Sequence, residues 1–461
     1  PNSAVLHITL GKCHFELGQI EHAIASYQKA TEIKPECAEA YFNMGMILKD
    51  KGELDAAIEN YQKVLKIDPN SAASYNNIGI AVEAKGDLAG AIKYVEKALS
   101  IKPDCAETHL NMGTMLKERG DLQAAIESYQ KGIQIDPNAF EVYNSMGNTF
   151  LAVGDLVQAV NSYRKAIKIK PDYAEVYNNI GVTLSVKRDH EGAINAFHQS
   201  LLINPGLVGT HYNLGSTLKS QGKTEEAIKT YKRVLELDPD NVSAKHILRA
   251  LTGQQTKAAP SVYVEELFDD YAERFDQSLV DQLKYKTPKL IAELILKHQS
   301  DAPLGSVLDL GCGTGLAGVE LKDFCQEIEG IDLSKKMLAK ARQKNVYSKL
   351  NHTGIVEYLT EAPLDFDLFM STDVFNYVGE LSEVFRLIKS RNKRSGRLAF
   401  STEHTEKADF FLEASGRYSH SKSYIDSLCN KFNYKLLHFS NSDLRKSGTE
   451  FITGGLYLLE F

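Results

Sequence analysis

The sequence predicts a multidomain chain: an all-α superhelix of repeated helix pairs, followed by an α/β domain with a mostly parallel sheet. Three observations support this prediction. Prolines recur every 34 residues over the first half of the chain. A later apolar run ends in the glycine-rich turn 311–315, as a buried strand does before a ligand-binding loop. After that turn, strand-like runs alternate with helical ones, which is the pattern of a parallel sheet.

Length and composition fit an ordinary protein of two or more domains. The chain has 461 residues, of which 25% are charged and 43% hydrophobic. Its net charge of -7 gives no overall argument for nucleic acid or an anionic membrane as a partner. The six cysteines are scattered without a C-x-x-C pair, which favours reduced thiols and a cytoplasmic setting over a disulfide frame or a zinc site. No apolar run reaches membrane-spanning length and no signal peptide is visible.

The first half of the chain is a repeat array. Glycines from Gly11 to Gly215 and alanines from Ala23 to Ala227 keep the same 34-residue period as the prolines. Small residues at these places let two helices approach closely, and an aromatic residue such as Tyr27 is expected to fill the gap between units. The periodic prolines are Pro35, Pro69, Pro103, Pro137, Pro171, Pro205 and Pro239. The period predicts seven helix pairs over 1–241 and a capping helix over 242–252.

This spacing is the tetratricopeptide signature, and the array resembles that of the O-linked N-acetylglucosamine transferases. Pro1 lies 34 residues before Pro35, in phase with the other prolines. We therefore expect a further repeat upstream of the sequence.

Asparagine recurs at the sixth position of the first helix in most units. The residues are Asn43, Asn77, Asn111, Asn179 and Asn213. This position lies off the packing face, so we expect it to line a concave groove, where a ladder of amides could hydrogen-bond the backbone of an extended peptide. Such a ladder resembles the one in the O-linked N-acetylglucosamine transferases. The alternative is that these asparagines are ordinary groove residues or make contacts between repeats. Either way, the array is expected to bind a protein or peptide.

A short polar linker is predicted at 253–261, and the second domain at 262–461. The domain begins with a helical stretch and continues into Ser306-Val-Leu-Asp-Leu-Gly-Cys-Gly-Thr-Gly315, a predicted strand, tight turn and helix. Asp332 ends the next apolar run. An acid roughly 20 residues after such a turn can grip the ribose of a nucleoside from the neighbouring strand.

The glycine turn has two interpretations. Residues 313–318 satisfy the dinucleotide pattern G-x-G-x-x-G, which makes a dinucleotide site the rival interpretation. However, the predicted strand carries an acid, Asp309, just before the turn. A carboxylate there would repel a pyrophosphate, and it would suit the cationic amino-acid end of S-adenosylmethionine.

The run V-L-D-L-G-C-G-T-G, followed by G-I-D-L-S, resembles motif I and the next acidic strand end of the class I methyltransferases, which have a Rossmann-like fold. Residues 262–461 as a whole resemble a bacterial family of predicted methyltransferases fused to tetratricopeptide repeats. The resemblance implies S-adenosylmethionine as cofactor, and it assigns roles to particular residues. Asp309, Gly311, Gly313 and Gly315 would line the methionine end, Asp332 would take the ribose hydroxyls, and Leu333 and Met337 would lie near the adenine.

Two further expectations follow from this resemblance. Helices before motif I fold over the cofactor in this family, which makes Tyr271, Phe275 and Tyr285 candidate lid aromatics. These enzymes often place an acid after the third strand for the adenine amino group. Residues 353–355 occupy that place here and include no carboxylate.

The acceptor side carries several candidate residues. Asp373, Asn376 and Tyr377 follow the fourth predicted strand, where a ligand is expected in this fold. A second polar cluster precedes the final predicted hairpin and consists of Arg417, Tyr418, His420 and Tyr424. Methyl transfer is an in-line displacement that orientation alone can accelerate, so no base is obligatory. If a proton must leave the acceptor, Asp373, Tyr377 or His420 could take it.

The sequence therefore predicts an S-adenosylmethionine-dependent methyltransferase with a scaffold that recruits a protein or peptide. Two alternatives stay open at this point. The enzyme could act on a small molecule while its repeats only localise it. Alternatively, the chain could be an interaction scaffold whose methyltransferase-like domain no longer turns over.

Overall fold

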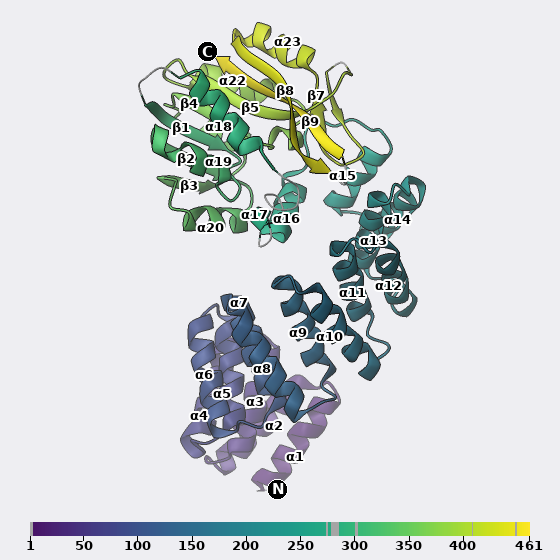
Figure 1. Ribbon diagram of the computed structural model, residues 1–461. Helices are drawn as coiled ribbons and strands as arrows, with labels where there is room; N and C mark the ends of the chain where they lie inside the picture. Colours follow the sequence, from purple (N-terminus) through teal and green to yellow (C-terminus); the bar gives the residue numbers. More distant parts are fainter. Residues whose placement is uncertain (1–2, 273–274, 278–284, 300–302, 408, 448–449) are drawn as a thin grey trace. The chain divides into compact units, whose positions relative to one another are not determined.

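The computed structural model describes residues 3–272, 275–277, 285–299, 303–407, 409–447 and 450–461 (Figure 1). The chain divides into two compact units, residues 1–217 and 218–461, and each is described by itself. Within the described residues, no helix is both long and apolar enough to cross a membrane.

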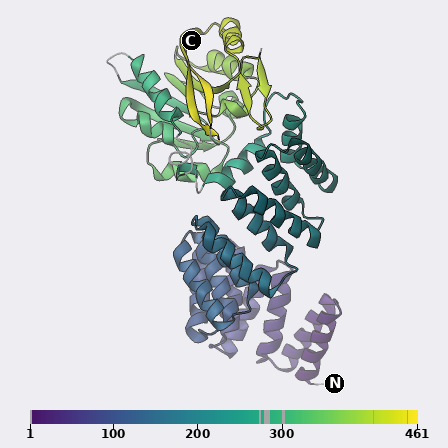
Figure 2. The same ribbon diagram turned by 45° about the vertical axis from the view of Figure 1, so that its right-hand side comes forward.

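The first unit is built from helix pairs, as the 34-residue period predicts. Consecutive helices lie side by side in both views (Figures 1 and 2). The prolines stand just beyond the second helix of each pair; Pro137, for example, follows the end of α8 at Ile135. The helices are α1 Ala4–Glu16, α2 Ile20–Ile33, α3 Ala38–Asp50, α4 Leu54–Ile67, α5 Ala72–Ala84, α6 Leu88–Ile101, α7 Ala106–Arg119, α8 Leu122–Ile135, α9 Phe140–Ala152, α10 Leu156–Ile169, α11 Ala174–Val186, α12 His190–Ile203 and α13 Val208–Ser220.

The periodic glycine and the aromatic residue meet inside each repeat. A Cβ on Gly147 would lie 2.5 Å from the ring of Tyr163, and one on Gly113 would lie 2.4 Å from Tyr129. Both tyrosines are completely buried. The aromatic side chain thus fills the space between the two helices of its own repeat, which corrects the expectation that it fills the gap between units.

In the described part of the second unit, the strands form one nine-stranded sheet. Strands β3, β2, β1, β4 and β5 are adjacent in that order and parallel, and β9 lies antiparallel beside β5 and pairs with β8. This arrangement confirms the predicted Rossmann-like α/β fold with its final hairpin. The strands are β1 Leu304–Leu310, β2 Cys325–Asp332, β3 Lys349–His352, β4 Leu368–Ser371, β5 Arg397–His404, β6 Phe410–Leu412, β7 Tyr418–His420, β8 Lys435–Ser447 and β9 Glu450–Glu460.

Helices cover both faces of this sheet because successive strand residues point to opposite sides. Leu308 and Leu310 pack into one apolar cluster, and Val307 belongs to another on the opposite face. The helices of the unit are α14 Thr224–Leu237, α15 Val242–Leu251, α16 Ser261–Tyr271, α17 Phe275–Gln277, α18 Thr287–Lys297, α19 Leu316–Leu321, α20 Lys335–Gln343, α21 Ile355–Glu361, α22 Ser382–Arg391 and α23 Lys422–Phe432. Parts of the expected helical stretch, 273–274 and 278–284, lie outside the described residues.

A short hairpin of β6 and β7 continues the sheet beside the last residues of β5, past the point where β4 ends. Glu403 of β5 pairs with Gly454 on one side and with Ser419 of β7 on the other. This hairpin matters for the site because the residue before β7 reaches the cavity described below.

The segment 253–261 is attached to the α/β domain over much of its length. The N–H of Ala259 donates to the carbonyl of Tyr377 (2.9 Å), and the N–H of Glu380 donates to the carbonyl of Lys257 (2.7 Å). Gln255 exchanges hydrogen bonds with the backbone of Leu412. This segment is called the bridging segment below. In the sequence, the boundary between the two compact units falls before this segment, within the seventh repeat.

Candidate active site

A cavity of about 640 Å³ lies in the second unit, at the edge where the parallel strands end. The glycine turn after β1, the end of β2 and the loop after β4 all contribute to its lining. Carboxyl ends of parallel strands are where ligands bind in open α/β sheets. The remaining wall comes from the bridging segment, from α16, from Arg417 before β7 and from Arg445 of β8.

The glycine turn exposes backbone to this cavity. Gly311 and Gly313 line it, with φ values of 81° and 54° that residues with a side chain rarely adopt. A Cβ on Gly311 would also lie 2.5 Å from Val374. Gly315 does not line the cavity. Its missing side chain leaves room for Tyr347, whose ring would lie 2.9 Å from a Cβ there.

Asp309 does not line the cavity, which contradicts the place that the family resemblance implied. Its side chain lies on the sheet face of Val307, is fully buried, and accepts a hydrogen bond from the hydroxyl of Tyr347 (2.8 Å). Its other carboxylate oxygen has no partner among the described residues. Burial raises the pKa of Asp309 to about 7, while the Tyr347 hydroxyl lowers it.

Asp332 lies at the cavity edge, as expected for the acid that follows β2. One carboxylate oxygen accepts the N–H of Gly313 and the other accepts the N–H of Ser334, both at 2.8 Å. Burial raises the pKa of Asp332, and these two N–H groups oppose the rise. Leu333 also lines the cavity, whereas Met337 is buried behind it in α20 and does not.

The wall after β3 contains an acid that the sequence prediction missed. Residues 353–355 line the cavity and carry no carboxylate, as expected, but Glu357 in the first turn of α21 lines the same wall. Its carboxylate accepts a long hydrogen bond from the N–H of Gly354 (3.4 Å). In the sequence, Glu357 lies only two residues after 353–355, the stretch where this acid was expected.

Aromatic side chains close much of the remaining wall. Tyr271, Phe275 and Tyr285, the three lid candidates, all line the cavity together with Phe268. The rings of Tyr271 and Phe275 meet edge to face at 5.4 Å, and Phe268 contacts Tyr377 at 5.3 Å. The cavity is therefore bounded largely by apolar surface.

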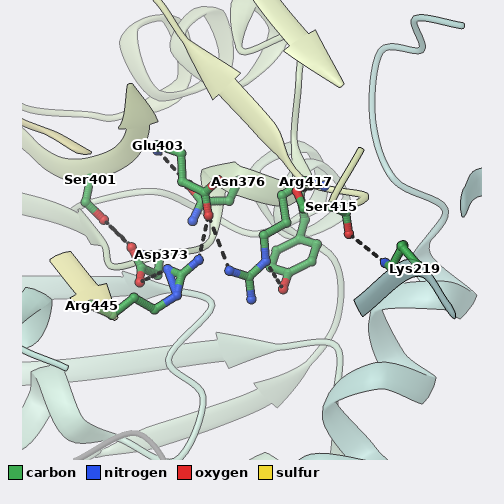
Figure 3. A network of polar contacts seen from close by, with 9 residues as sticks. Lys219, Asp373, Asn376, Ser401, Glu403, Ser415, Arg417 and Arg445 are labelled. Atoms are coloured by element: carbon green, nitrogen blue, oxygen red, sulfur yellow. Dashed lines mark hydrogen bonds and ion pairs between the residues drawn. The ribbon is translucent and has the colours of Figure 1, made fainter. Parts of the chain in front are cut away.

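Asp373, in the loop after β4, also lines the cavity, and Figure 3 shows its polar contacts. It adopts a left-handed φ of 56°, which is uncommon for a residue with a side chain. The hydroxyl of Ser401 donates to its Oδ1 (3.2 Å), and Arg445 donates to its Oδ2 (3.1 Å). Burial raises the pKa of Asp373 to about 6, and the nearby charge of Arg417 lowers it.

A buried glutamate, Glu403, joins two arginines behind Asp373 (Figure 3). Its Oε1 accepts from Arg445 at 2.5 Å and from Arg417 at 3.3 Å. Burial raises the pKa of Glu403 to about 7. Arg417 also donates through Nε to the hydroxyl of Tyr377 (3.1 Å), and the Asn376 side chain accepts the N–H of Glu403 (3.1 Å).

His420 does not reach the cavity, so its expected role as a base has no support from its position. The side chain is fully buried, and its Nε2 lies 3.0 Å and 2.9 Å from the carbonyls of Val378 and Gly379. Burial lowers the pKa of His420 to about 4. His420 lies in β7, where it pairs with His404 of β5, and its side chain is buried inside the protein. Of the predicted polar cluster 417–424, only Arg417 lines the cavity.

The turn before Arg417 is held by the end of the repeat array. The carbonyl of Ser415 accepts from the ammonium of Lys219 in α13 (3.1 Å), as Figure 3 shows, and the carbonyl of Gly416 lies 2.9 Å from Nε2 of His246 in α15. Burial lowers the pKa of Lys219 to about 8, and the positive charge of Arg417 lowers it further.

Three of the five asparagines in the array make contacts between neighbouring repeats. The Nδ2 of Asn111, Asn179 and Asn213 donates to an asparagine side chain one repeat earlier, at 3.1, 3.1 and 3.0 Å. Asn77 accepts from the ammonium of Lys49 (3.2 Å), and Asn43 is half-buried. These contacts match the alternative interpretation, in which the asparagines connect repeats.

Comparison with known families agrees with the fold. Residues 302–442 match the model of a methyltransferase domain. Tetratricopeptide repeat models match 11–49, 45–86, 72–105, 113–154, 147–185 and 209–241. The chain thus carries tetratricopeptide repeats in its N-terminal part and a methyltransferase domain in its C-terminal part, which confirms the predicted combination.

The similar curated proteins are methyltransferases of low identity. A protein of Geobacillus sp. (strain WCH70) that is named as a methyltransferase is 29% identical over 153 residues, or 32% of this chain and 61% of the relative. The ubiquinone biosynthesis O-methyltransferase of Proteus mirabilis is 25% identical, covering 25% and 50%. The ribosomal protein L11 methyltransferase of Burkholderia lata is 30% identical, covering 29% and 43%. This chain spans less than two thirds of the length of each.

Solved structures with similar repeats include MamA and YrrB. MamA is 28% identical, covering 36% of this chain and 92% of that chain with a TM-score of 0.34. YrrB, a TPR protein described with an unusual peptide-binding site, is 26% identical, covering 39% and 92% with a TM-score of 0.33.

Proposed function

We propose that this protein is an S-adenosylmethionine-dependent methyltransferase whose repeats bind a protein or peptide, which is itself a candidate acceptor. The observation that carries the proposal is a cavity in the second unit. It joins the glycine turn and Asp332 at one end to Asp373 and Tyr377 at the other. One ligand at each end would place two reacting groups in a common apolar enclosure, where orientation lowers the barrier to transfer.

The residues at the first end fit the proposed cofactor. Gly311 and Gly313 leave bare backbone at the cavity wall, where a Cβ at Gly311 would collide with Val374. Asp332 presents a carboxylate to the ribose hydroxyls, held in place by two backbone N–H groups. Leu333 offers an apolar contact to the adenine, and Glu357 could accept its amino group. When bound, S-adenosylmethionine supplies an electrophilic methyl group.

The residues at the second end suit an acceptor. Asp373 carries a carboxylate with a pKa of about 6, so it is mainly ionised near pH 7 and can accept a proton from a hydroxyl or amine. Tyr377 presents a hydroxyl that is oriented by Arg417. Phe268, Phe275 and Tyr271 limit the access of water to this space.

We further propose that the functional methyltransferase unit begins at residue 218. The bridging segment supplies Ala258 and Ala259 to the cavity wall, and α15 contacts the turn before Arg417.

All six cysteines are unpaired, which supports a reducing, cytoplasmic setting.

Calorimetry on the full chain tests the cofactor proposal. S-adenosylhomocysteine should bind, and NAD should not. Binding of NAD without any response to S-adenosylhomocysteine would favour the dinucleotide interpretation instead. With tritiated S-adenosylmethionine and a cell lysate, label should enter the protein fraction. Label in small molecules would make the repeats a localising device, and no label would favour a scaffold without turnover.

A further inference from the structure

Arg417 is the more exposed of the two arginines in the polar network at the acceptor end. Its side chain is 31% exposed, whereas that of Arg445 is 6% exposed. An arginine has five N–H donors. Among the described residues, the Arg417 side chain donates through Nε to the Tyr377 hydroxyl and through one terminal nitrogen to the Glu403 carboxylate. The other donors of a guanidinium that lines a cavity are available to a ligand.

Arg445 already forms ion pairs with both acids of this network, Asp373 and Glu403. One of its terminal nitrogens donates to Asp373 and the other to Glu403, at 3.1 and 2.5 Å. Arg417 reaches only the Glu403 oxygen that Arg445 also holds, and at a longer distance of 3.3 Å. Its charge is therefore less well compensated than that of Arg445.

A third cation adds to this local charge. The Lys219 ammonium, bonded to the carbonyl of Ser415, lies close enough to Arg417 for the guanidinium to lower its pKa. Glu413 in the same turn is paired with Lys407 at 3.5 Å. Of the charged groups in this network, two cations, Arg417 and Arg445, and one acid, Asp373, line the cavity, and this balance favours an anionic ligand.

The position of Arg417 is fixed from outside the cavity. The carbonyls of the two preceding residues contact Lys219 and His246. Gly416 has a φ of 89°, and a Cβ there would lie 2.7 Å from Ile247. The end of the repeat array therefore holds the backbone that carries Arg417. Because this backbone is already ordered, binding of a ligand to the guanidinium costs less conformational entropy.

We propose that the methyl acceptor carries an oxyanion, a carboxylate or a phosphate, on an apolar body, and that the Arg417 guanidinium binds this group. The apolar body would lie against Phe268 and Phe275 of the same cavity. A carboxylate or phosphate offers the paired oxygens that a guanidinium fork binds best. This inference rests on the proposed function and names the substrate class of its acceptor end.

The test uses the full chain saturated with S-adenosylhomocysteine and three probes that share a naphthalene body. These are 2-naphthoate, 2-naphthyl phosphate and the neutral 2-naphthamide, with dissociation constants measured by ligand-observed NMR. At least one anion should bind about 10-fold or more tightly than the amide, as expected for a charged hydrogen bond. The tighter anion identifies the class of oxyanion. Equal affinity for all three probes would overturn the inference.

Variants locate the binding group. Arg417→Gln should abolish the preference for the anion and leave S-adenosylhomocysteine affinity unchanged, and Arg417→Lys should retain part of the preference. Arg386→Gln, at an arginine paired with Glu383 on the surface of α22, is the matched control and should change neither. Survival of the preference in Arg417→Gln would also overturn the inference. If that variant does not fold, the three probes on the unchanged protein still decide.

The two proposals fail in different ways. If S-adenosylhomocysteine itself does not bind, the proposed function fails. If it binds and the anions show no preference, only the acceptor class is wrong.

Discussion

The Nε2 of His246 lies 2.9 Å from the carbonyl oxygen of Gly416, the residue before Arg417. His246 belongs to α15, at the end of the repeat array, and is 2% exposed. Its ring also packs against Tyr263 at 4.7 Å. This contact links the last helix of the array to the hairpin that supplies Arg417 to the cavity, so the two predicted domains share structure at the site.

A fragment that starts at residue 262 should therefore be less stable than one that starts at residue 218. The shorter fragment lacks the bridging segment and α15, and it exposes Leu412 and Tyr418, which pack against Ala250. Urea unfolding followed by circular dichroism should give a lower midpoint for the shorter fragment. Equal midpoints would show that residues 218–261 add nothing to the stability of the α/β domain.

Acid should destabilise the second unit through His420. The unfolded histidine has a pKa near 6.5, while burial lowers the folded pKa to about 4. Below pH 6.5 the unfolded chain binds a proton that the folded chain does not, so stability falls from about pH 6.5 to pH 4. Asp309 and Glu403, whose folded pKa values are raised to about 7, act in the opposite direction.

The contribution of His420 is isolated by comparison with His420→Gln. The unfolding free energy of the unchanged protein minus that of the variant should shrink as pH falls, by about 1.4 kcal/mol per pH unit at most. His420→Asn serves as a second variant if the first does not fold. A difference that stays constant between pH 6.5 and 4 would contradict the lowered pKa.

Asp332→Ala should weaken binding of S-adenosylhomocysteine by about 1.5–3 kcal/mol, because it removes a charged acceptor from the proposed ribose position. Calorimetry on the full chain measures the change. Asp323→Ala, at an exposed acid before β2, is the control and should bind normally. Unchanged affinity in Asp332→Ala would remove this residue from the proposed cofactor site.

Gly147→Ala should destabilise the first unit by about 1–3 kcal/mol, because the added methyl group would overlap the buried Tyr163 ring. Gly209→Ala is the matched control. A Cβ at Gly209 meets no atom within 4 Å, and alanine is the better helix former. Thermal unfolding should show a loss for the first variant and none for the second. A combined Gly147→Ala, Tyr163→Leu variant should recover part of the loss.

Replacing Asn111, Asn179 and Asn213 together by alanine should lower the stability of the array. Asn111 and Asn213 each lose one hydrogen bond between repeats and Asn179 loses two, each bond worth about 0.5–1.5 kcal/mol. Thermal unfolding of the triple variant measures this effect. An unchanged melting temperature together with lost capture of a protein partner would instead support the peptide-binding ladder.

Local patterns in the sequence predicted the fold. The 34-residue period determined the helix pairs, and the order of strands, glycine turn and Asp332 determined the α/β domain, because each of these signals lies within a short stretch. The alternation of side chains along β1 also indicates the direction of the Asp309 side chain, although the place of this residue in motif I suggested the opposite direction. Since Leu308 and Leu310 face one apolar cluster, Asp309 must face the other side of the sheet, away from the cavity.

Contacts between residues far apart in the sequence were not predicted. Tyr347 reaches Asp309 across 38 residues, and Arg445 reaches Asp373 across 72. No spacing rule marks such pairs, because they depend on how β8 and the loop after α20 return to the sheet. His420 shows the reverse case, since its polar character suggested a site residue while strand pairing buried it.

The two arginines of the acceptor end come late in the chain. Gly311, Asp332 and Glu357 are synthesised well before Arg417 and Arg445, yet all five residues line one cavity. Because a domain generally folds as a unit, neither end of the site is complete until β8 has been made. A chain that stops before Arg445 would leave the buried carboxylates of Asp373 and Glu403 without this counter-charge.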